Sequence, residues 1–238
     1  MTQQLIDPGA IGEMVEILAG YGAWGETGVN RLVYTPEWSA AQDQVATWLE
    51  EAGLEVERDA VGNIWGWLRG SSSEKALVTG SHIDSQKPGG QYDGALGVIA
   101  AIAAVRSLRD RVGTPRQTLG VVSLCEEEAS RFARTNFWGS RAVVGGIAPG
   151  EADKMRAIDG PTMAEIMRDI GLDPSAIPGA KRDDLAGFIE LHIEQGPLLE
   201  EHDLPVGIVQ RITGYKQFWL DLHGQANHAG TTPMDLRR

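Results

Sequence analysis

Apolar residues recur along the chain in patterns typical of helices and of buried strands. Their helical spacing over residues 11–18 predicts an amphipathic helix near the N-terminus. Further helices are predicted over residues 36–52, 94–109 and 163–170, and strands over residues 54–58, 63–68, 76–79, 118–124 and 187–193. Because compact apolar strands alternate with helices, we expect an α/β fold with a mixed, mostly parallel sheet flanked by helices.

The pattern changes toward the C-terminus. Residues 206–213 and 217–222 alternate between apolar and polar side chains, which predicts antiparallel strands. The sequence then ends shortly after a turn-like GTTP segment, without a further helix or strand to cover these residues. We therefore expect one domain over residues 1–211 and the truncated start of a second domain at residues 212–238.

The composition narrows the classes of protein to consider. The 238 residues include 21 Lys and Arg against 33 Asp and Glu, which gives a net charge of −12. A chain this acidic repels phosphate groups, so we expect no nucleic-acid partner. The single cysteine, Cys125, excludes an internal disulfide framework and a zinc site built on cysteines. Because the N-terminus does not resemble a signal peptide and no apolar run reaches about 18 residues, we expect a cytoplasmic protein without a membrane partner.

A histidine and an aspartate follow the predicted strand 76–79. His82 and Asp84 are two residues apart, so on an extended segment both side chains point to the same side. At the carboxyl end of a parallel strand, that side faces the crevice in which α/β proteins bind ligands. His82 could therefore bind a metal ion while Asp84 accepts a hydrogen bond from its other ring nitrogen. A histidine that is simply hydrogen-bonded within a loop is the alternative.

Acidic residues lie beside a predicted helix and a predicted strand. Asp93 stands in a glycine-rich turn, where it could bind a cation or cap the following helix. Residues 126–128 are three successive glutamates after a buried strand, and their mutual repulsion favours a neighbouring cation, either a metal ion or Arg131. Adjacent carboxylates can also divide their roles, one binding metal and one moving protons. A solvated start of a helix is the alternative for these glutamates.

The predicted strand 187–193 carries polar residues on one face. Glu190, His192 and Glu194 alternate with apolar residues. This alternation suits either a half-buried strand whose polar side faces a cleft or an edge strand with one solvated face.

Oxygen and imidazole donors thus gather at the ends of the predicted strands. They are His82, Asp93, Glu128 and His192. This donor set, which contains no thiolate, suits zinc, manganese, cobalt or nickel, and a shared aspartate could hold two ions. Two ions a few ångströms apart can activate water and stabilise a tetrahedral intermediate, so the residues by themselves predict a metal-dependent hydrolase.

Five sequence motifs follow one another along the chain. They are GSHIDS, GGQYDGALGV, EEEASRF, ELHIEQGPLLE and GQANHAGTTPMDLRR. In this order they resemble the hydantoinase/carbamoylase family of amidohydrolases, which is related to the aminoacylase and carboxypeptidase clan of dinuclear metallopeptidases. The resemblance implies a metal-binding catalytic domain of that clan over residues 1–211 and the start of an α+β lid and dimerisation domain at residues 212–238.

The resemblance also implies a set of metal ligands. His82 and His192 would bind one of two divalent ions per subunit. Asp93 would bridge both ions, and Glu128 would bind the second. A further histidine ligand and the substrate-binding residues of the lid have no counterpart in this sequence, so we expect a truncated chain.

Catalytic and substrate-binding roles are implied in the same way. Glu127 would act as the general base, and Asp84 would orient His82. Gln195 would contact the ureido or carboxylate part of the substrate. His228 would reach the active site of a neighbouring subunit and stabilise the developing oxyanion, so a homodimer is expected.

The implied reaction cleaves the carbamoyl C–N bond of an N-carbamoyl-L-amino acid and releases ammonia, carbon dioxide and the amino acid. Allantoate, hydrolysed at a ureido carbon in the same way, is the alternative substrate. A di- or aminopeptidase of the related clan is a second alternative, although that branch usually has Asp or Glu where this chain has His192. A non-catalytic binding module is the third, and the presence of Glu127 beside the ligand set argues against it.

Overall fold

The computed structural model describes residues 6–133, 135–214, 216, 218, 220, 221 and 223–238. By its internal contacts the chain divides into two units, Met1–Ile193 and Glu194–Arg238, and each is described by itself. A domain boundary near residue 212 stays a prediction. Among the described residues, no helix is both long and apolar enough to cross a membrane.

Three helices of the first unit form where the sequence predicts them. α1 (Pro8–Gly20) follows Asp7, and α2 (Pro36–Glu51) follows Thr35. Both side chains accept a hydrogen bond from a backbone N–H of the first helical turn, and each helix has proline near its start. α3 (Ala95–Val112) is the longest helix and has seven buried residues, all small or apolar. The helical periodicity of the sequence is therefore confirmed at these three segments.

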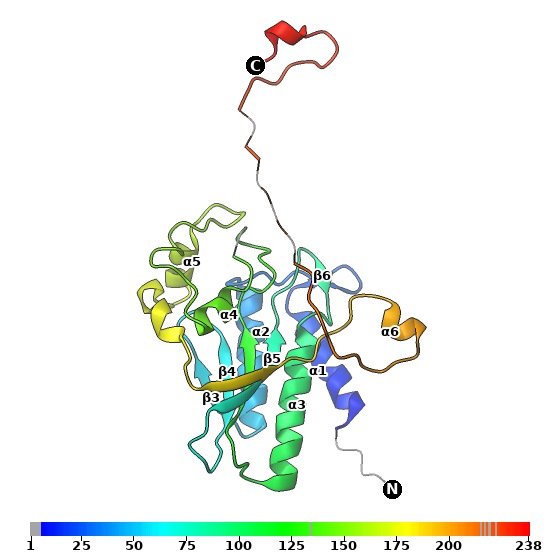
Figure 1. Cartoon of the computed structure of the whole chain (residues 1–238), viewed down its shortest axis with the longest axis vertical. Helices are drawn as coiled ribbons and strands as arrows, with labels where there is room; N and C mark the ends of the chain where they lie inside the picture. The colour runs from blue at the N-terminus through cyan, green and yellow to red at the C-terminus, as the bar shows by residue number, and fades with distance from the viewer. Residues whose placement is uncertain (1–5, 134, 215, 217, 219, 222) are drawn as a thin grey trace. The chain divides into compact units, whose positions relative to one another are not determined.

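A five-stranded sheet forms the centre of the first unit (Figure 1). Its strands are β3 (Glu55–Arg58), β4 (Ile64–Leu68), β5 (Ala76–His82), β7 (Leu119–Leu124) and β8 (Leu185–Ile189), in the order β3-β4-β7-β5-β8. β5 pairs in parallel with β7 and β8, whereas β4 pairs antiparallel with β3 and β7. The expected mixed sheet flanked by helices is confirmed, and in the described chain its parallel and antiparallel pairings are equal in number.

Apolar residues cover both faces of this sheet. On one face, Ile64 and Val121 pack with apolar residues of α1, α2 and α3. On the other face, Trp65 and Trp67 stack with their ring centroids 5.3 Å apart, and the guanidinium of Arg182 lies over the Trp67 ring. Because adjacent strand residues point to opposite faces, one strand supplies both layers. Because both faces of the sheet are covered, the loops that follow β5 and β7 lie at the carboxyl ends of these strands.

Shorter elements complete the two units. A small sheet joins β1 (Ala23–Trp24), β2 (Gly28–Val29) and β6 (Gly89–Gly90). The first unit also contains α4 (Trp138–Val143), α5 (Met163–Asp169) and a 3₁₀ helix at Pro174–Ala180. The second unit contains α6 (Leu198–Glu201) and a 3₁₀ helix at Met234–Leu236.

The prediction of a buried strand over residues 187–193 is wrong in its end and in its burial. β8 stops at Ile189, where its last pairing is with Thr79 of β5. Within the described chain β5 is its sole strand neighbour, so β8 lies at the edge of the sheet. Phe188 and Ile189 are accordingly 47% and 69% exposed. β8 is thus an edge strand, but it ends before Glu190, His192 and Glu194, so neither alternative drawn from the sequence describes these polar residues as part of a strand.

The prediction of antiparallel strands in the second unit is not confirmed. Residues 206–213 are described, and none of them lies in a strand. Their apolar side chains are exposed, because no neighbouring strand in the described chain pairs with this segment. Of the second predicted strand, residues 217, 219 and 222 lie outside the described residues.

Candidate metal centre

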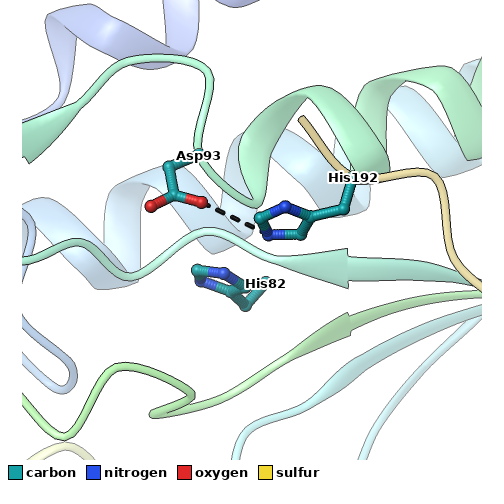
Figure 2. A group of neighbouring side chains, drawn as sticks. All are labelled: His82, Asp93 and His192. Atoms are coloured by element: carbon teal, nitrogen blue, oxygen red, sulfur yellow. Dashed lines mark ion pairs between the residues drawn. The ribbon is translucent and has the colours of Figure 1, made fainter. Parts of the chain in front are cut away.

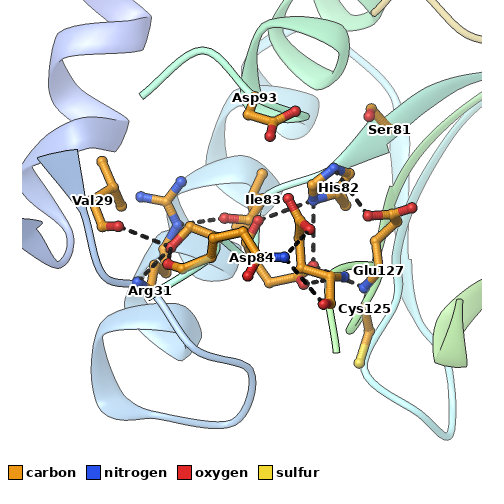
Figure 3. A network of polar contacts seen from close by, with 12 residues as sticks. Val29, Arg31, Ser81, His82, Ile83, Asp84, Asp93, Cys125 and Glu127 are labelled. Atoms are coloured by element: carbon orange, nitrogen blue, oxygen red, sulfur yellow. Dashed lines mark hydrogen bonds and ion pairs between the residues drawn. The ribbon is translucent and has the colours of Figure 1, made fainter. Parts of the chain in front are cut away.

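His82 is the last residue of β5 and is 2% exposed. Its Nδ1 lies 3.0 Å from the backbone carbonyl oxygen of Asp84. Because a carbonyl can only accept a hydrogen bond, Nδ1 carries a proton, and Nε2 is the ring nitrogen that is left to bind a metal ion. Nε2 faces a carboxylate, 3.6 Å from Oε2 of Glu127 (Figure 3). This is the ring orientation that a metal-binding histidine requires.

The loop before α3 brings Asp93 to the same place. The N-cap of α3 is Gly94, which has no side chain to cap with, so the N-cap alternative for Asp93 is wrong. Gly94 has φ +65°, and a Cβ at this position would lie 2.5 Å from Nε2 of His82. Glycine is therefore required for the loop to approach the imidazole. It leaves the Asp93 carboxylate directed toward the two histidines (Figure 2).

His192 repeats the orientation of His82. Its Nδ1 lies 2.9 Å from the carbonyl oxygen of Ile193, and its Nε2 lies 3.3 Å from Oδ1 of Asp93. The imidazole rings of His82 and His192 are roughly parallel, with centroids 6.2 Å apart (Figure 2). His82 at the end of β5 and His192 after the end of β8 thus both hold Nδ1 against a backbone carbonyl and turn Nε2 toward carboxylates.

Asp84 holds the glutamate loop against β5. Its carboxylate oxygens accept hydrogen bonds from the backbone N–H groups of Glu127, at 3.2 Å, and Glu128, at 3.0 Å. The same carboxylate is 3.5 Å from Nδ1 of His82, farther away than the Asp84 carbonyl. Both the backbone and the carboxylate of Asp84 therefore approach Nδ1 of His82, and the carboxylate also fixes the glutamate loop.

The glutamates 126–128 do not begin a helix. α4 starts only at Trp138, so a solvated helix start is wrong for them. Glu126 is fully buried, and its Oε1 accepts hydrogen bonds from the Phe132 N–H and from the Thr135 hydroxyl. Burial and the charge of Asp84 raise the pKa of Glu126 to about 8. Arg131, the expected protein cation, donates its hydrogen bonds to the Val33 carbonyl and to Asp159, but its positive charge still lowers the pKa of Glu126 and so offsets part of the burial.

Side-chain pKa values show that this region favours positive charge. Burial raises the pKa of Glu127 to about 6 and also raises that of Glu128. Burial by itself lowers the pKa of His82, but hydrogen bonding and the charges of Asp84, Glu127 and Glu128 outweigh it and raise the value to about 9. The hydrogen bond between His192 and Asp93 raises the pKa of the histidine to about 9 and lowers that of the aspartate. The carboxylates therefore create a negative potential that a cation would relieve.

Two overlapping groups of side chains fit a metal ion. His82, Asp93 and His192 form one group, and His82, Glu127 and Glu128 form the other. Within each group the candidate ligand atoms all lie within 4.8 Å of one another. Imidazole and carboxylate donors suit zinc and its divalent neighbours. The residues predicted from the sequence as ligands are thus brought together, with Glu127 beside them.

Gln195 and His228 belong to the second unit. Both are exposed, and Gln195 has φ +55°. The Nδ1 of His228 accepts hydrogen bonds from the backbone N–H groups of Gly230, at 3.1 Å, and Thr231, at 3.3 Å. Their expected roles toward a substrate stay predictions.

Two residues at the site have no part in the sequence predictions. Gln86 donates from Nε2 to Oε2 of Glu128 at 2.5 Å, and it directly follows the GSHIDS motif, which is a signal that could have identified it. Arg31 is buried, and its Nε donates to the Ile83 carbonyl at 2.7 Å, between His82 and Asp84 in the chain (Figure 3). Nothing in the spacing of the sequence connects Arg31 to the site.

Comparison with known proteins places this geometry in a family. The model of peptidase family M20/M25/M40 matches residues 78–234. An allantoate amidohydrolase of Bacillus subtilis is 44% identical over 99% of this chain and 57% of its own length. An N-carbamoyl-L-amino-acid amidohydrolase of Paenarthrobacter aurescens is 38% identical over 100% of this chain and 58% of its own length. The chain therefore spans little more than half the length of these relatives.

Solved structures agree with the sequence matches. The crystal structure of a hydantoinase/carbamoylase family amidase from Burkholderia ambifaria superimposes with a TM-score of 0.78 and 30% identity. The superposition covers 98% of this chain and 56% of the amidase. The family match includes all four predicted metal ligands, which lie between residues 82 and 192. This chain belongs to peptidase family M20/M25/M40 and, within it, is similar to the hydantoinase/carbamoylase amidases.

Proposed function

We propose that this protein hydrolyses the carbamoyl C–N bond of a ureido compound, with N-carbamoyl-L-amino acids as the first substrate class and allantoate as the second. The observation that carries the proposal is the pair His82 and His192, whose Nε2 atoms face one cluster of carboxylates. Relatives named for allantoate and for N-carbamoyl-L-amino acids match at 44% and 38% identity. Their names support ureido chemistry and leave the choice of substrate to experiment.

Four side chains would hold two divalent ions, with zinc, manganese, cobalt and nickel as candidates. His82 and His192 would bind one ion, Asp93 would bridge both, and Glu128 would bind the second. The contacts of Asp93 with His192 and of Glu128 with Gln86 already restrain these carboxylates. When bound, the ions would supply Lewis acidity to the ureido carbonyl and to the attacking water.

Glu127 is proposed as the general base. Its carboxylate is one third exposed and stands beside His82, so it can reach both the site and a substrate. Burial raises the pKa of Glu127 to about 6, close to neutral pH, where a carboxylate can both accept and return a proton. It would take a proton from the attacking water and deliver it to the leaving nitrogen. Asp84 supports this role by holding the backbone of Glu127.

The second unit is proposed to contribute to substrate binding. Residues 1–211 would form the metal-binding catalytic part, and residues 212–238 would begin a lid and dimerisation part. Gln195 would contact the ureido or carboxylate group. Because Nδ1 of His228 accepts two backbone hydrogen bonds, its proton is on Nε2, from which it can donate to an oxyanion in the partner subunit of a homodimer.

Ammonia release tests the reaction directly. The protein, reloaded with manganese, zinc or cobalt, is offered N-carbamoyl-L-amino acids, N-carbamoyl-β-alanine and allantoate, and the same protein treated with a chelator is the control. We expect metal-dependent ammonia release, and the best substrate identifies the substrate class. If none of these compounds releases ammonia from metal-loaded protein, the proposal is wrong, and hydrolysis of dipeptides in the same assay would favour the peptidase alternative.

The base is tested by Glu127→Gln, which removes a proton acceptor and keeps the size of the side chain. We expect turnover to fall by at least about a hundredfold, because general-base catalysis contributes on that order. Metal content, measured by elemental analysis, should stay at the level of the unmodified protein. A variant that loses metal in proportion to activity would show that Glu127 is a ligand rather than the base.

The role of His228 across subunits is tested by mixing two inactive variants. His228→Ala should strongly reduce turnover at unchanged metal content, because it removes the oxyanion donor and no ligand. If this histidine serves the partner subunit, a mixed dimer of His228→Ala and Glu127→Gln contains one intact site. Random mixing then restores about a quarter of full activity. Mixtures that stay as inactive as their components contradict the exchange between subunits.

A further inference from the structure

The segment that carries His192 has no regular secondary structure to fix it. β8 ends at Ile189, and the His192 side chain is 33% exposed. Beyond the last pairing of Thr79 with Ile189, the backbone of this segment leaves the ladder with β5. A metal ligand on such a segment needs another restraint, because ligands that are held in place bind more tightly.

We propose that the hydrogen bond between Ser81 and Glu190 is a clasp that positions His192 opposite His82. The Ser81 hydroxyl donates to Oε1 of Glu190. Ser81 precedes His82 on β5 and is 1% exposed, and Glu190 stands two residues before His192. A single side-chain contact therefore joins the two segments that carry the histidines. The inference rests on the proposed function and adds positioning residues to that site.

The clasp lies just beyond the end of the backbone ladder between β5 and β8. Backbone hydrogen bonds hold β8 to β5 as far as Ile189. If the ladder continued, it would keep both segments at the spacing of adjacent strands, about 4.8 Å. Glu190 directly follows Ile189, so the clasp connects the two segments at the residue after the last ladder pairing. The side chains therefore stay in contact while the two backbones move apart. The two rings can then face each other with their centroids 6.2 Å apart.

Helix α3 supports the clasp from a third side. A Cβ at Gly97 would collide with the carbonyl oxygen of Leu191 and would lie 2.8 Å from Cβ of Ser81. The first turn of α3, β5 and the His192 segment therefore meet at one point. Because α3 directly follows the Asp93 loop, this point connects the segments that carry Asp93, His82 and His192.

Charge makes the clasp stronger than an ordinary hydroxyl contact. Glu190 is an acceptor that carries a negative charge, and hydrogen bonds to charged acceptors are about twice as strong as neutral ones. Ser81 is buried, which limits the access of water to its hydroxyl, whereas the Glu190 side of the contact is exposed. Glutamine at position 190 would keep an acceptor oxygen of the same reach, whereas alanine would not.

The test measures Co²⁺ binding and its visible absorption spectrum in folded protein. Ser81→Ala and Glu190→Ala should bind the His192-side ion about tenfold more weakly, which is typical when the support of a ligand is lost, and should show a changed spectrum. Glu190→Gln keeps an acceptor oxygen without the charge, so it should lose less affinity than Glu190→Ala and keep the original spectrum. Glu200→Ala, which removes an exposed carboxylate of α6, is the matched control and should behave as unmodified protein.

A double-mutant cycle distinguishes the clasp from general destabilisation. If the two side chains act through each other, Ser81→Ala combined with Glu190→Ala weakens Co²⁺ binding no more than either change alone. Additive losses, or single variants with unchanged affinity and spectrum, overturn the clasp and leave the proposed function intact. Unmodified protein that binds no Co²⁺, or binds it equally well after His82→Ala, overturns the proposed function and the clasp with it.

Discussion

The burial of like charges at the carboxyl ends of β5 and β7 is the constraint on which the rest of the site depends. Asp84 and Glu126 are almost fully buried, and Glu127 and Glu128 follow directly in the chain. Such carboxylates lose their hydration and repel one another, so the fold must place donors and cations beside them. Backbone N–H groups donate hydrogen bonds to the Asp84 carboxylate, and the Thr135 hydroxyl donates one to the Glu126 carboxylate. The charge that remains is reflected in the raised pKa values of the two histidines.

The parallel pairing of β5 with β7 brings the acidic residues and His82 together in one site. Because β5 and β7 run side by side, His82 lies opposite Leu124 and the glutamate loop begins directly beside it. The glycine at position 94 then admits the Asp93 loop, and the end of β8 delivers His192. Each proposed ligand comes from a different strand end or loop, so no single element forms the candidate centre by itself. In the proposed arrangement the first unit holds the metal ions and the general base, and the second binds substrate.

Much of this arrangement could be predicted from the sequence, and the exceptions have physical reasons. Apolar periodicity was sufficient for α1 to α3 and for β5 and β7, since burial dictates their residues. The end of β8 could not be predicted, because it depends on pairing with β5 rather than on its own composition. For Asp93, a helix cap and a metal ligand have the same local pattern, and only the approach of His192 separates them. Ser81 and Gln86 lie within and directly after the GSHIDS motif, but their partners could not be predicted, because each contacts a residue distant in sequence.

A divalent cation that relieves the repulsion among these buried carboxylates must stabilise the folded protein, and the free energy of unfolding measures this most directly. Urea unfolding is followed with saturating Zn²⁺ and with a chelator, for unmodified protein and for His82→Ala. An ion at a hundred times its dissociation constant adds about 2.7 kcal/mol per site to the free energy of unfolding. We predict a gain of at least about this size in the unmodified protein and most of it lost in His82→Ala. Equal stability with Zn²⁺ and with chelator, or an equal gain in His82→Ala, would contradict the account.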